Sequence, residues 1–214
     1  MTDQQLAFAP ATEQLRLLET GKIGAAELLE LYLERIDRFN PAYNLVVAFD
    51  RDRARASAHE IDRQRASGEP LGPLAGLPIT IKDSFEVTGM PTTCGFEHLR
   101  DHRPERDADA VTLLREAGAN VFGKTNLPTG ASDWQSFNPV YGISRNPWNP
   151  DRTVGGSSGG AAGAVAAGFT AFELGSDIGG SIRFPANWCG VCGHKTTWGI
   201  VSQAGHLPPA PDTA

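Results

Sequence analysis

The sequence is short of the features that mark secreted and membrane proteins. No uninterrupted apolar run reaches the ~18 residues that a membrane-spanning helix needs. The first residues lack the basic and then apolar order of a secretory signal. The three cysteines are an odd number, which favours free thiols in a reducing compartment. Together these shortages predict a cytoplasmic protein without a membrane partner.

Positive charge is scarce as well. The net charge of −6 at pH 7 argues against nucleic acid as a direct partner. No G-x-x-x-x-G-K-[ST] phosphate loop is present, so nucleotide hydrolysis is not expected. Only four of the 19 basic residues are lysines, at positions 22, 82, 124 and 195. Because arginine stays protonated in proteins, a side-chain amine that acts as a base has to be one of these few.

The pattern of apolar residues predicts one α/β domain. The 214 residues, 40% of them hydrophobic, are enough for a single core. Strands are expected over 45–49, 74–82 and 120–124, and helices over 13–20, 25–39, 50–66, 108–117 and 161–167. The second helix should end at Asn40-Pro41. Alternating strands and helices favour a parallel or mixed sheet. Residues 125–152 have no period but carry aromatic side chains, which favours an ordered wall.

Two serines lie in glycine-rich turns that are 24 positions apart. Ser157 follows Gly155-Gly156, and Ser181 follows Gly179-Gly180. Glycine lacks a Cβ, so such a turn can approach a ligand closely and present backbone N–H groups as anion donors. A Gly/Ser cluster is also typical of a flexible linker. The small-residue helix and the apolar run over 169–174 that follow directly favour a site over a linker.

A serine hydroxyl is a weak nucleophile at neutral pH and needs an adjacent base. Five histidines are present, but sequence spacing does not show which of them is near a serine. Lysine can serve if burial lowers its pKa from ~10.4. Lys82 and Lys124 each end an apolar run, although a lysine at a strand end can also extend its ammonium to water. The residues alone leave both lysines open as the base.

A long segment of the chain resembles a known family. GGSSGGAAGAVAAG over 155–168, followed by ELGSDIGGSIRFPANWCGVCGHKTTWG over 173–199, is similar to the amidase signature family of serine hydrolases. Weaker similarity extends from about residue 15 to the C-terminus. The resemblance implies a three-layer α/β/α fold with a central mixed sheet. Because members of the family are longer, it also implies that 1–214 is the N-terminal part of one domain, with a C-terminal portion absent.

The resemblance also implies a mechanism. Lys82, in I-K-D, matches the family's base; Ser157 matches a bridging serine that relays the proton, and Ser181 matches the nucleophile. The implied reaction hydrolyses an amide C–N bond to acid and amine through an acyl-enzyme, without cofactor or metal. The implied oxyanion hole consists of the backbone N–H groups of Ile178, Gly179, Gly180 and Ser181.

Supporting roles are expected for three neighbours. Asp177 is expected to tune the turn or bind Arg183, although a plain turn aspartate is an equal alternative. Arg183 is expected to brace the site. Ser158 either hydrogen-bonds the glycine loop or caps the helix that follows, and the cap is favoured. A hydrophobic pocket for an acyl or aryl amide is assigned to four aromatic residues, Trp134, Phe137, Phe184 and Trp188.

Two other kinds of site are weighed. Residues 155–159 satisfy G-x-S-x-G, with Asp177 and then His194 or His206 downstream, but that nucleophile elbow needs a strand directly before it and 146–152 is poor strand material. Cys189 and Cys192, followed by His194, suggest a zinc or redox site. Its remaining ligands would be only Cys94 and His206, so two packed thiols are favoured over a metal.

Other functions within and beyond the family are carried as alternatives. One is the glutaminase (A) subunit of a glutamyl-tRNA amidotransferase-like complex. Another is an inactive fragment, or one part of a split enzyme. The expected partners are a small-molecule amide and either a second copy of the chain or a complementing C-terminal fragment.

Overall fold

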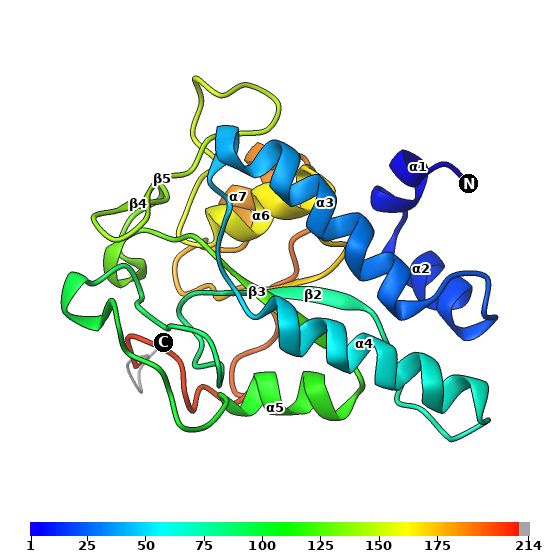
Figure 1. Ribbon diagram of the computed structural model, residues 1–214. Helices are drawn as coiled ribbons and strands as arrows, with labels where there is room; N and C mark the ends of the chain where they lie inside the picture. Colours follow the sequence, from blue (N-terminus) through cyan, green and yellow to red (C-terminus); the bar gives the residue numbers. More distant parts are fainter. Residues whose placement is uncertain (210–214) are drawn as a thin grey trace.

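A computed structural model describes residues 1–209 (Figure 1). Its main sheet has four strands in the order β1-β3-β2-β6: β1 (Val46–Phe49), β2 (Pro78–Lys82), β3 (Asn120–Thr125) and β6 (Glu173–Leu174). β2 is parallel to both β3 and β6, whereas β1 is antiparallel to β3. The sheet is therefore mixed, and the α/β prediction is confirmed. A second, two-stranded sheet pairs β4 (Phe137–Asn138) with β5 (Gly142–Ile143).

Helices cover both faces of the main sheet. Figure 1 shows α3, α6 and α7 on one side of the strands and α5 on the other. The seven α-helices among the described residues are α1 (Asp3–Ala7), α2 (Ala11–Glu19), α3 (Ala25–Tyr43), α4 (Arg51–Ala66), α5 (Asp109–Glu116), α6 (Gly159–Ala166) and α7 (Arg183–Cys189). Two 3-10 turns, Glu97–Leu99 and Thr129–Ala131, interrupt the longer connections. The three-layer arrangement agrees with the predicted fold class.

The side chains of β2 point alternately to the two faces of the main sheet. Ile79 and Ile81 pack into the apolar cluster that contains Val111 of α5. Side chains alternate along a strand, so Thr80 and Lys82 point to the opposite face. That face is covered by α6, and the apolar residues of α3, α4 and α6 form a second, larger cluster there. The sheet therefore places the side chain of Lys82 in the layer between β2 and α6.

Several predicted boundaries were wrong, including the start of α2, which lies at Ala11 rather than at residue 13. α3 continues through Pro41 to Tyr43 and ends at Asn44, which has left-handed dihedral angles (φ 53, ψ 51). Pro41 removes one backbone N–H donor, which the helix tolerates so close to its end. The Asn40 side chain accepts hydrogen bonds from the N–H groups of Leu45 and Val46, just after the helix ends. β2 begins at Pro78, because 74–77 form a turn against Ala117. α6 begins at Gly159, two residues before the predicted start.

The predicted wall over 125–152 is confirmed as ordered, and its order depends on buried amides. Asn138 Nδ2 donates to Asn126 Oδ1 and to the Leu127 carbonyl, each at 2.7 Å. Ser144 Oγ donates to the Asn44 carbonyl at 2.6 Å. These bonds tie the β4–β5 hairpin to the ends of β3 and α3. Within 1–209, no helix has both the length and the apolar character that a membrane crossing requires.

The segment after residue 201 returns to the end of β2. Glu86 N–H donates to the Gly205 carbonyl at 2.8 Å, and Leu207 N–H donates to the Ser84 carbonyl at 2.6 Å. This return places His206 edge-on to Phe85, with 4.8 Å between ring centroids. A histidine more than 100 positions away in sequence thereby reaches the end of the strand that carries Lys82.

Candidate active site

The two glycine-flanked serines lie in adjacent turns. Ser157 ends the segment before α6 and Ser181 lies just before α7, and these two helices pack against each other. Ser158 N–H donates to the Ser181 carbonyl at 3.0 Å, so one turn is hydrogen-bonded directly to the other. Ser157 is fully buried, while Ser181 keeps 9% of its surface exposed. The peptide bond between Gly156 and Ser157 is cis. The fold thus brings together two serines that the sequence separates.

Glycine is required at close approaches in this region. Gly180 has φ +112°, and a Cβ there would lie 2.3 Å from the ring of Phe184. In α6, a Cβ at Gly160 would lie 2.4 Å from the backbone nitrogen of Asn126. The first glycine permits the turn before Ser181, and the second lets α6 lie directly against the end of β3.

Lys82 contacts two serine hydroxyls from the last position of β2. Its side chain is fully buried, and Nζ lies 2.6 Å from Ser157 Oγ and 2.9 Å from Ser176 Oγ. Among residues 1–209 no ion pair joins Lys82 to a carboxylate. Burial lowers the pKa of the Lys82 ammonium from 10.5 to about 7. A large fraction of this lysine is therefore a neutral amine at neutral pH, held against a serine hydroxyl.

Lys124, which the residues alone did not distinguish from Lys82, has a different environment. Its Nζ lies 3.1 Å from Asp83 Oδ1 and donates to the Phe85 carbonyl and Thr92 Oγ1 at 2.8 and 2.9 Å. Burial lowers the pKa of Lys124, and the charge of Asp83 opposes that shift. Lys124 pairs with Ile81 in the β2–β3 register, so it points to the face opposite Lys82. Its contacts are those of a structural ion pair.

A buried carboxyl shares the face of Lys82. Glu173 accepts a hydrogen bond from Thr125 Oγ1 at 2.6 Å and another from Thr80 Oγ1. Burial raises the pKa of Glu173 to about 8, so this carboxyl is mostly neutral at pH 7. The charge of Glu173 raises the pKa of Lys82 only in part, and burial outweighs it.

Asp177 organises the turn that carries Ser181. Its carboxylate accepts from the N–H groups of Gly180 and Ile182 at 2.8 and 3.0 Å, and from the Arg183 guanidinium at 2.9 and 3.0 Å. Burial opposes the charge, but hydrogen bonds from Arg183 and from the backbone hold the pKa of Asp177 well below its usual range. Asp177 thus makes both of the contacts weighed for it, one set within the turn and one with Arg183.

The Asp177 contacts alter the predicted oxyanion hole. The Gly180 N–H donates to Asp177 and is not free to bind a substrate oxygen in this structure. Within the described chain, the N–H groups of Ile178, Gly179 and Ser181 have no intramolecular acceptor. Three of the four predicted donors are therefore available to an anion.

The favoured role of Ser158 as a helix cap was wrong. Ser158 precedes α6, but its side chain makes no capping hydrogen bond. Its hydroxyl instead donates to the Ser176 carbonyl at 3.1 Å and accepts from the Ser176 N–H at 3.2 Å. Ser158 thus fixes the backbone of Ser176, which contacts Lys82, rather than the glycine loop that was the other role considered for it.

The predicted aromatic pocket is only partly assembled. Trp134 and Phe184 meet edge-to-face at 4.9 Å, and Phe184 stacks on Trp188 at 6.1 Å. These rings flank the glycines before both serines. Phe137 belongs instead to the β4–β5 hairpin, opposite Ile143.

None of the four aromatic residues lines the cavity of about 490 Å³ beside the serine turns. That cavity is mainly apolar and is bordered by Ser158, Ser176 and Asp177, whereas Lys82, Ser157 and Ser181 do not line it. Its apolar lining includes Phe172, Leu174, Ile178, Ile182, Val191 and Trp198. The prediction missed it because the chain after 190 folds back and closes it.

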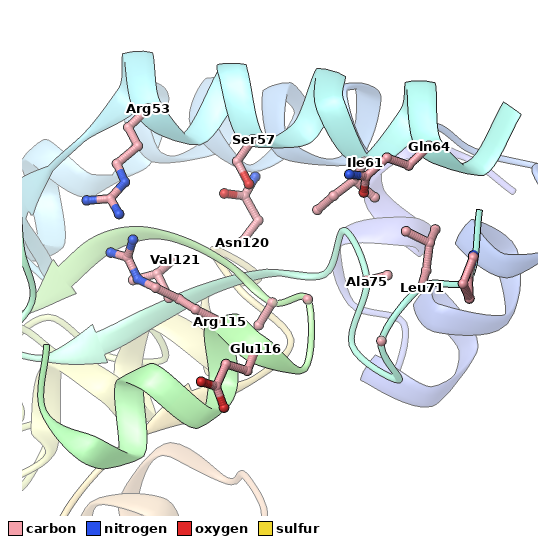
Figure 2. A pocket seen from close by; sticks show the side chains of 14 residues that line it. Arg53, Ser57, Ile61, Gln64, Leu71, Ala75, Arg115, Glu116, Asn120 and Val121 are labelled. Atoms are coloured by element: carbon pink, nitrogen blue, oxygen red, sulfur yellow. The ribbon is translucent and has the colours of Figure 1, made fainter. Parts of the chain in front are cut away.

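A second cavity, of about 400 Å³, lies between α4, α5 and the start of β3 (Figure 2). Arg53 and Arg115 extend into it from two helices. Arg53 donates to the carbonyl and hydroxyl of Thr88 at 3.1 and 3.2 Å, and Arg115 Nε lies 3.2 Å from Asp107 Oδ2. Both arginines therefore have structural partners, and none of the predicted catalytic residues lines this cavity.

The rival sites are not assembled. No strand precedes Ser157 directly, so the nucleophile elbow lacks its geometry, and the Asp177 carboxylate is bound by Arg183 rather than by a histidine. Cys189 is buried and Cys192 is exposed. Over the described part of the chain, no three His, Cys, Asp or Glu side chains come together as a metal-binding group.

Sequence reasoning missed Ser176 and the contact made by His206. Ser176 Oγ lies 2.9 Å from both Lys82 Nζ and His206 Nε2. Ser176 stands within the matched segment, five positions before Ser181, and that proximity was the available signal. His206 was considered only as a metal ligand or a triad histidine.

Removing the carboxylate of Asp177 is expected to disorder the turn. We expect Asp177→Ala to destabilise the fold by about 3 kcal/mol, because several charge-assisted hydrogen bonds of about 1.5–3 kcal/mol each lose their acceptor. Arg183→Ala should cost much less, since the guanidinium is half exposed and the backbone N–H groups keep their acceptor. Urea unfolding of both variants measures the difference, and equal losses would contradict this role of Asp177.

Comparisons with known proteins agree with this geometry. The Amidase family model matches residues 27–213. An acylamidase of Rhodococcus erythropolis is 42% identical over 203 residues, 95% of this chain and 43% of that protein. One glutamyl-tRNA(Gln) amidotransferase subunit, from Synechococcus sp. (strain CC9605), is 45% identical over 188 residues, 88% of this chain and 38% of that protein. The chain thus spans about two fifths of the length of these relatives.

Solved structures give the same result. A bacterial aryl acylamidase of the amidase signature family matches with a TM-score of 0.80 and 34% identity, over 85% of this chain and 38% of that one. A crystal structure of an amidase matches with a TM-score of 0.85 and 43% identity, over 94% of this chain and 46% of that one. With the family model covering most of its length and these identities above 30%, the chain belongs to the amidase signature family.

Proposed function

We propose that this chain carries the catalytic residues of an amidase that hydrolyses a carboxylic amide through an acyl-enzyme. The observation that supports it most directly is the buried amine of Lys82, which lies 2.6 Å from Ser157 Oγ and has no carboxylate partner in the described part of the chain. Burial keeps a large part of that amine neutral at pH 7, and a neutral amine can accept a proton. Lys82 is the base, Ser157 the bridging serine and Ser181 the nucleophile.

The acylation step moves one proton over two hydroxyls. Ser181 Oγ bonds to the amide carbon while its proton passes to Ser157 Oγ, and the Ser157 proton passes to Lys82 Nζ. The carbonyl oxygen becomes negative and is bound by the free N–H groups of Ile178, Gly179 and Ser181. Each preorganised donor of this kind is worth about 3–4 kcal/mol of barrier.

Collapse of the intermediate reverses the relay. The C–N bond breaks as the leaving nitrogen takes a proton from Ser157, which regains one from Lys82. Water then attacks the Ser181 ester, gives its proton to the same relay and releases the acid. No cofactor is needed for these steps, because every proton that is removed is returned.

The substrate class follows from the lining of the cavity beside the serine turns. Its wall is formed mainly by apolar side chains, among them Phe172, Leu174 and Ile178. Apolar lining binds apolar acyl or aryl groups by removing their surface from water. A hydrophobic acyl or aryl amide is therefore the proposed substrate. The similarity to an acylamidase and to an aryl acylamidase supports the same choice.

The glutaminase alternative is supported by the 45% identity to a glutamyl-tRNA(Gln) amidotransferase subunit. A direct comparison separates the two functions: the chain is assayed with an aryl acylamide and with glutamine, measuring acid release. Faster turnover of the aryl acylamide is expected. Faster ammonia release from glutamine would favour the glutaminase, and no turnover of either, with no covalent labelling of Ser181, would contradict both.

A second polypeptide is proposed to complete the site. Within residues 1–209, β6 has a neighbouring strand on the β2 side alone, so its other edge is unpaired there. Exposed apolar side chains flank that edge and the cavity: Phe172, Ile178, Trp198, Ile200 and Val201. More than half of the length of the relatives lies outside the part that this chain matches. We expect the C-terminal part of a relative, added as a separate polypeptide, to raise the hydrolysis rate. A second copy of this chain, detected by sedimentation, is the alternative partner.

A further inference from the structure

Besides its contact with Ser157, Lys82 begins a hydrogen-bonded chain that runs through Ser176 to His206. Ser176 Oγ lies 2.9 Å from Lys82 Nζ and 2.9 Å from His206 Nε2. On the far side of the imidazole, Nδ1 lies 3.0 Å from the carbonyl oxygen of Pro208. The ring is held in place by its edge-on contact with Phe85. None of the steps of the proposed hydrolysis uses Ser176, His206 or Pro208.

The Pro208 carbonyl determines the tautomer of His206. A carbonyl oxygen can only accept, so Nδ1 must carry the hydrogen. Burial, with a smaller contribution from the Lys82 charge, lowers the pKa of His206 to about 4, although the contact with Pro208 opposes this. The imidazole is therefore neutral at pH 7, and Nε2 offers a lone pair. The hydroxyl of Ser176 faces that lone pair and donates its hydrogen to it.

The direction of this bond determines what Ser176 can do toward Lys82. A hydroxyl has one hydrogen, and Ser176 uses it on His206, so toward Lys82 it can only accept. A neutral amine has two hydrogens and a single lone pair. One N–H is directed at Ser176, so the lone pair is not used there and is free to accept from the hydroxyl of Ser157, whose oxygen lies 2.6 Å from Nζ. If Ser176 were free to donate, its hydrogen would compete with that of Ser157 for the same lone pair.

We propose that His206 is a positioning residue that, through Ser176, directs the lone pair of Lys82 toward Ser157. The inference rests on the proposed function, because it concerns how the base of that reaction is oriented. Ser158 contributes by fixing the backbone of Ser176 on both its N–H and its carbonyl.

The first test removes the acceptor without removing the ring. In His206→Phe both nitrogens are lost while an aromatic ring remains beside Phe85. The rate of Ser181 labelling by a fluorophosphonate at pH 8 should fall about 10-fold, the factor that one net hydrogen bond supplies. His98→Phe, which removes an exposed histidine that has no contact with Ser176 or Lys82, should label at the wild-type rate. If wild type labels at Ser181 and His206→Phe labels equally fast, the inference is wrong while the proposed function stands.

A double variant separates positioning from packing. Ser176→Ala removes the competing hydroxyl, so adding His206→Phe to it should cause no further loss of labelling rate. If the His206 ring mattered only for packing, the fold-loss of labelling rate in the double variant would equal the product of the losses in the two single variants. Multiplying losses would overturn the inference.

A third measurement does not depend on activity. In ¹⁵N NMR of the wild-type chain at pH 7, assigned with His206→Phe, we expect the Nδ1–H tautomer with an unprotonated Nε2. The Nε2–H tautomer or an imidazolium at that pH would overturn the inference. If wild type does not label at Ser181, the proposed function fails, and the tautomer still decides whether His206 directs Ser176.

Discussion

Replacing Ser181 by alanine is expected to lower amide hydrolysis by about 10⁴-fold or more and to abolish covalent labelling by a fluorophosphonate. The reason is that the acyl group has no other attachment point, and single substitutions of a serine nucleophile remove nearly all of the catalysis that the whole catalytic group provides. Intact-mass spectrometry of the labelled chain measures the effect without a knowledge of the natural substrate. The free N–H groups around Ser181 should remain, so a small residual rate over water is expected.

The matched control is Ser132→Ala. Ser132 is exposed, and its hydroxyl donates only to the Thr129 carbonyl, so labelling should be unchanged. Peptide mapping of the wild-type adduct should place the added mass on the peptide that contains Ser181. Mass gained by the Ser181→Ala variant on the peptide with Ser157 would assign the nucleophile to the other turn and exclude the proposed order of proton transfer.

Local patterns were sufficient to predict the elements and the two serine turns. The glycines around Ser157 and Ser181 act within a few residues, through the missing Cβ, and so they are visible in sequence. The face of the sheet to which a strand residue points depends instead on how its strand pairs with neighbours that are distant in sequence. A register shift interrupts the β2–β3 pairing between Ile79 and Thr80, and such a shift decides which side chains share a face. Lys82 and Lys124 therefore looked alike in sequence and differ in the fold.

The contacts that sequence reasoning missed are long-range and polar. Ser176 and His206 are 30 positions apart, and they meet only because 202–208 return to the end of β2. No period or motif carries that information. The cap predicted for Ser158 failed for a related reason: a local preference for helix starts was outweighed by two hydrogen bonds to Ser176, which tertiary packing brings into reach.

The two buried lysines should respond to the same substitution in different ways. Lys82→Met should retain the fold and lose about 10²–10⁴-fold in hydrolysis, the usual contribution of general-base catalysis. The loss should be largest at and below about pH 7 and should narrow above it, because hydroxide can then replace the amine. Lys124→Met should instead destabilise the fold by about 3–5 kcal/mol, because it leaves the buried carboxylate of Asp83 without its ion-pair partner.

The stability of Lys82→Met provides a test that needs no substrate. The pKa of Lys82 is about 7 when folded and ordinarily 10.5, so between these values the unfolded chain binds more protons. Wild-type stability therefore rises with pH across that window, by up to about 1.4 kcal/mol per pH unit, and below pH 7 the folded state bears the full cost of burying the ammonium. Lys82→Met has no such pH dependence. The free energy of unfolding of the variant minus that of wild type should therefore be largest at and below pH 7 and should decrease toward pH 10. Because Lys124 and Glu173 remain in both proteins, the difference between the two curves isolates Lys82. A difference independent of pH would mean that the amine is not perturbed in the fold, and a base acting at neutral pH would then have to be sought elsewhere.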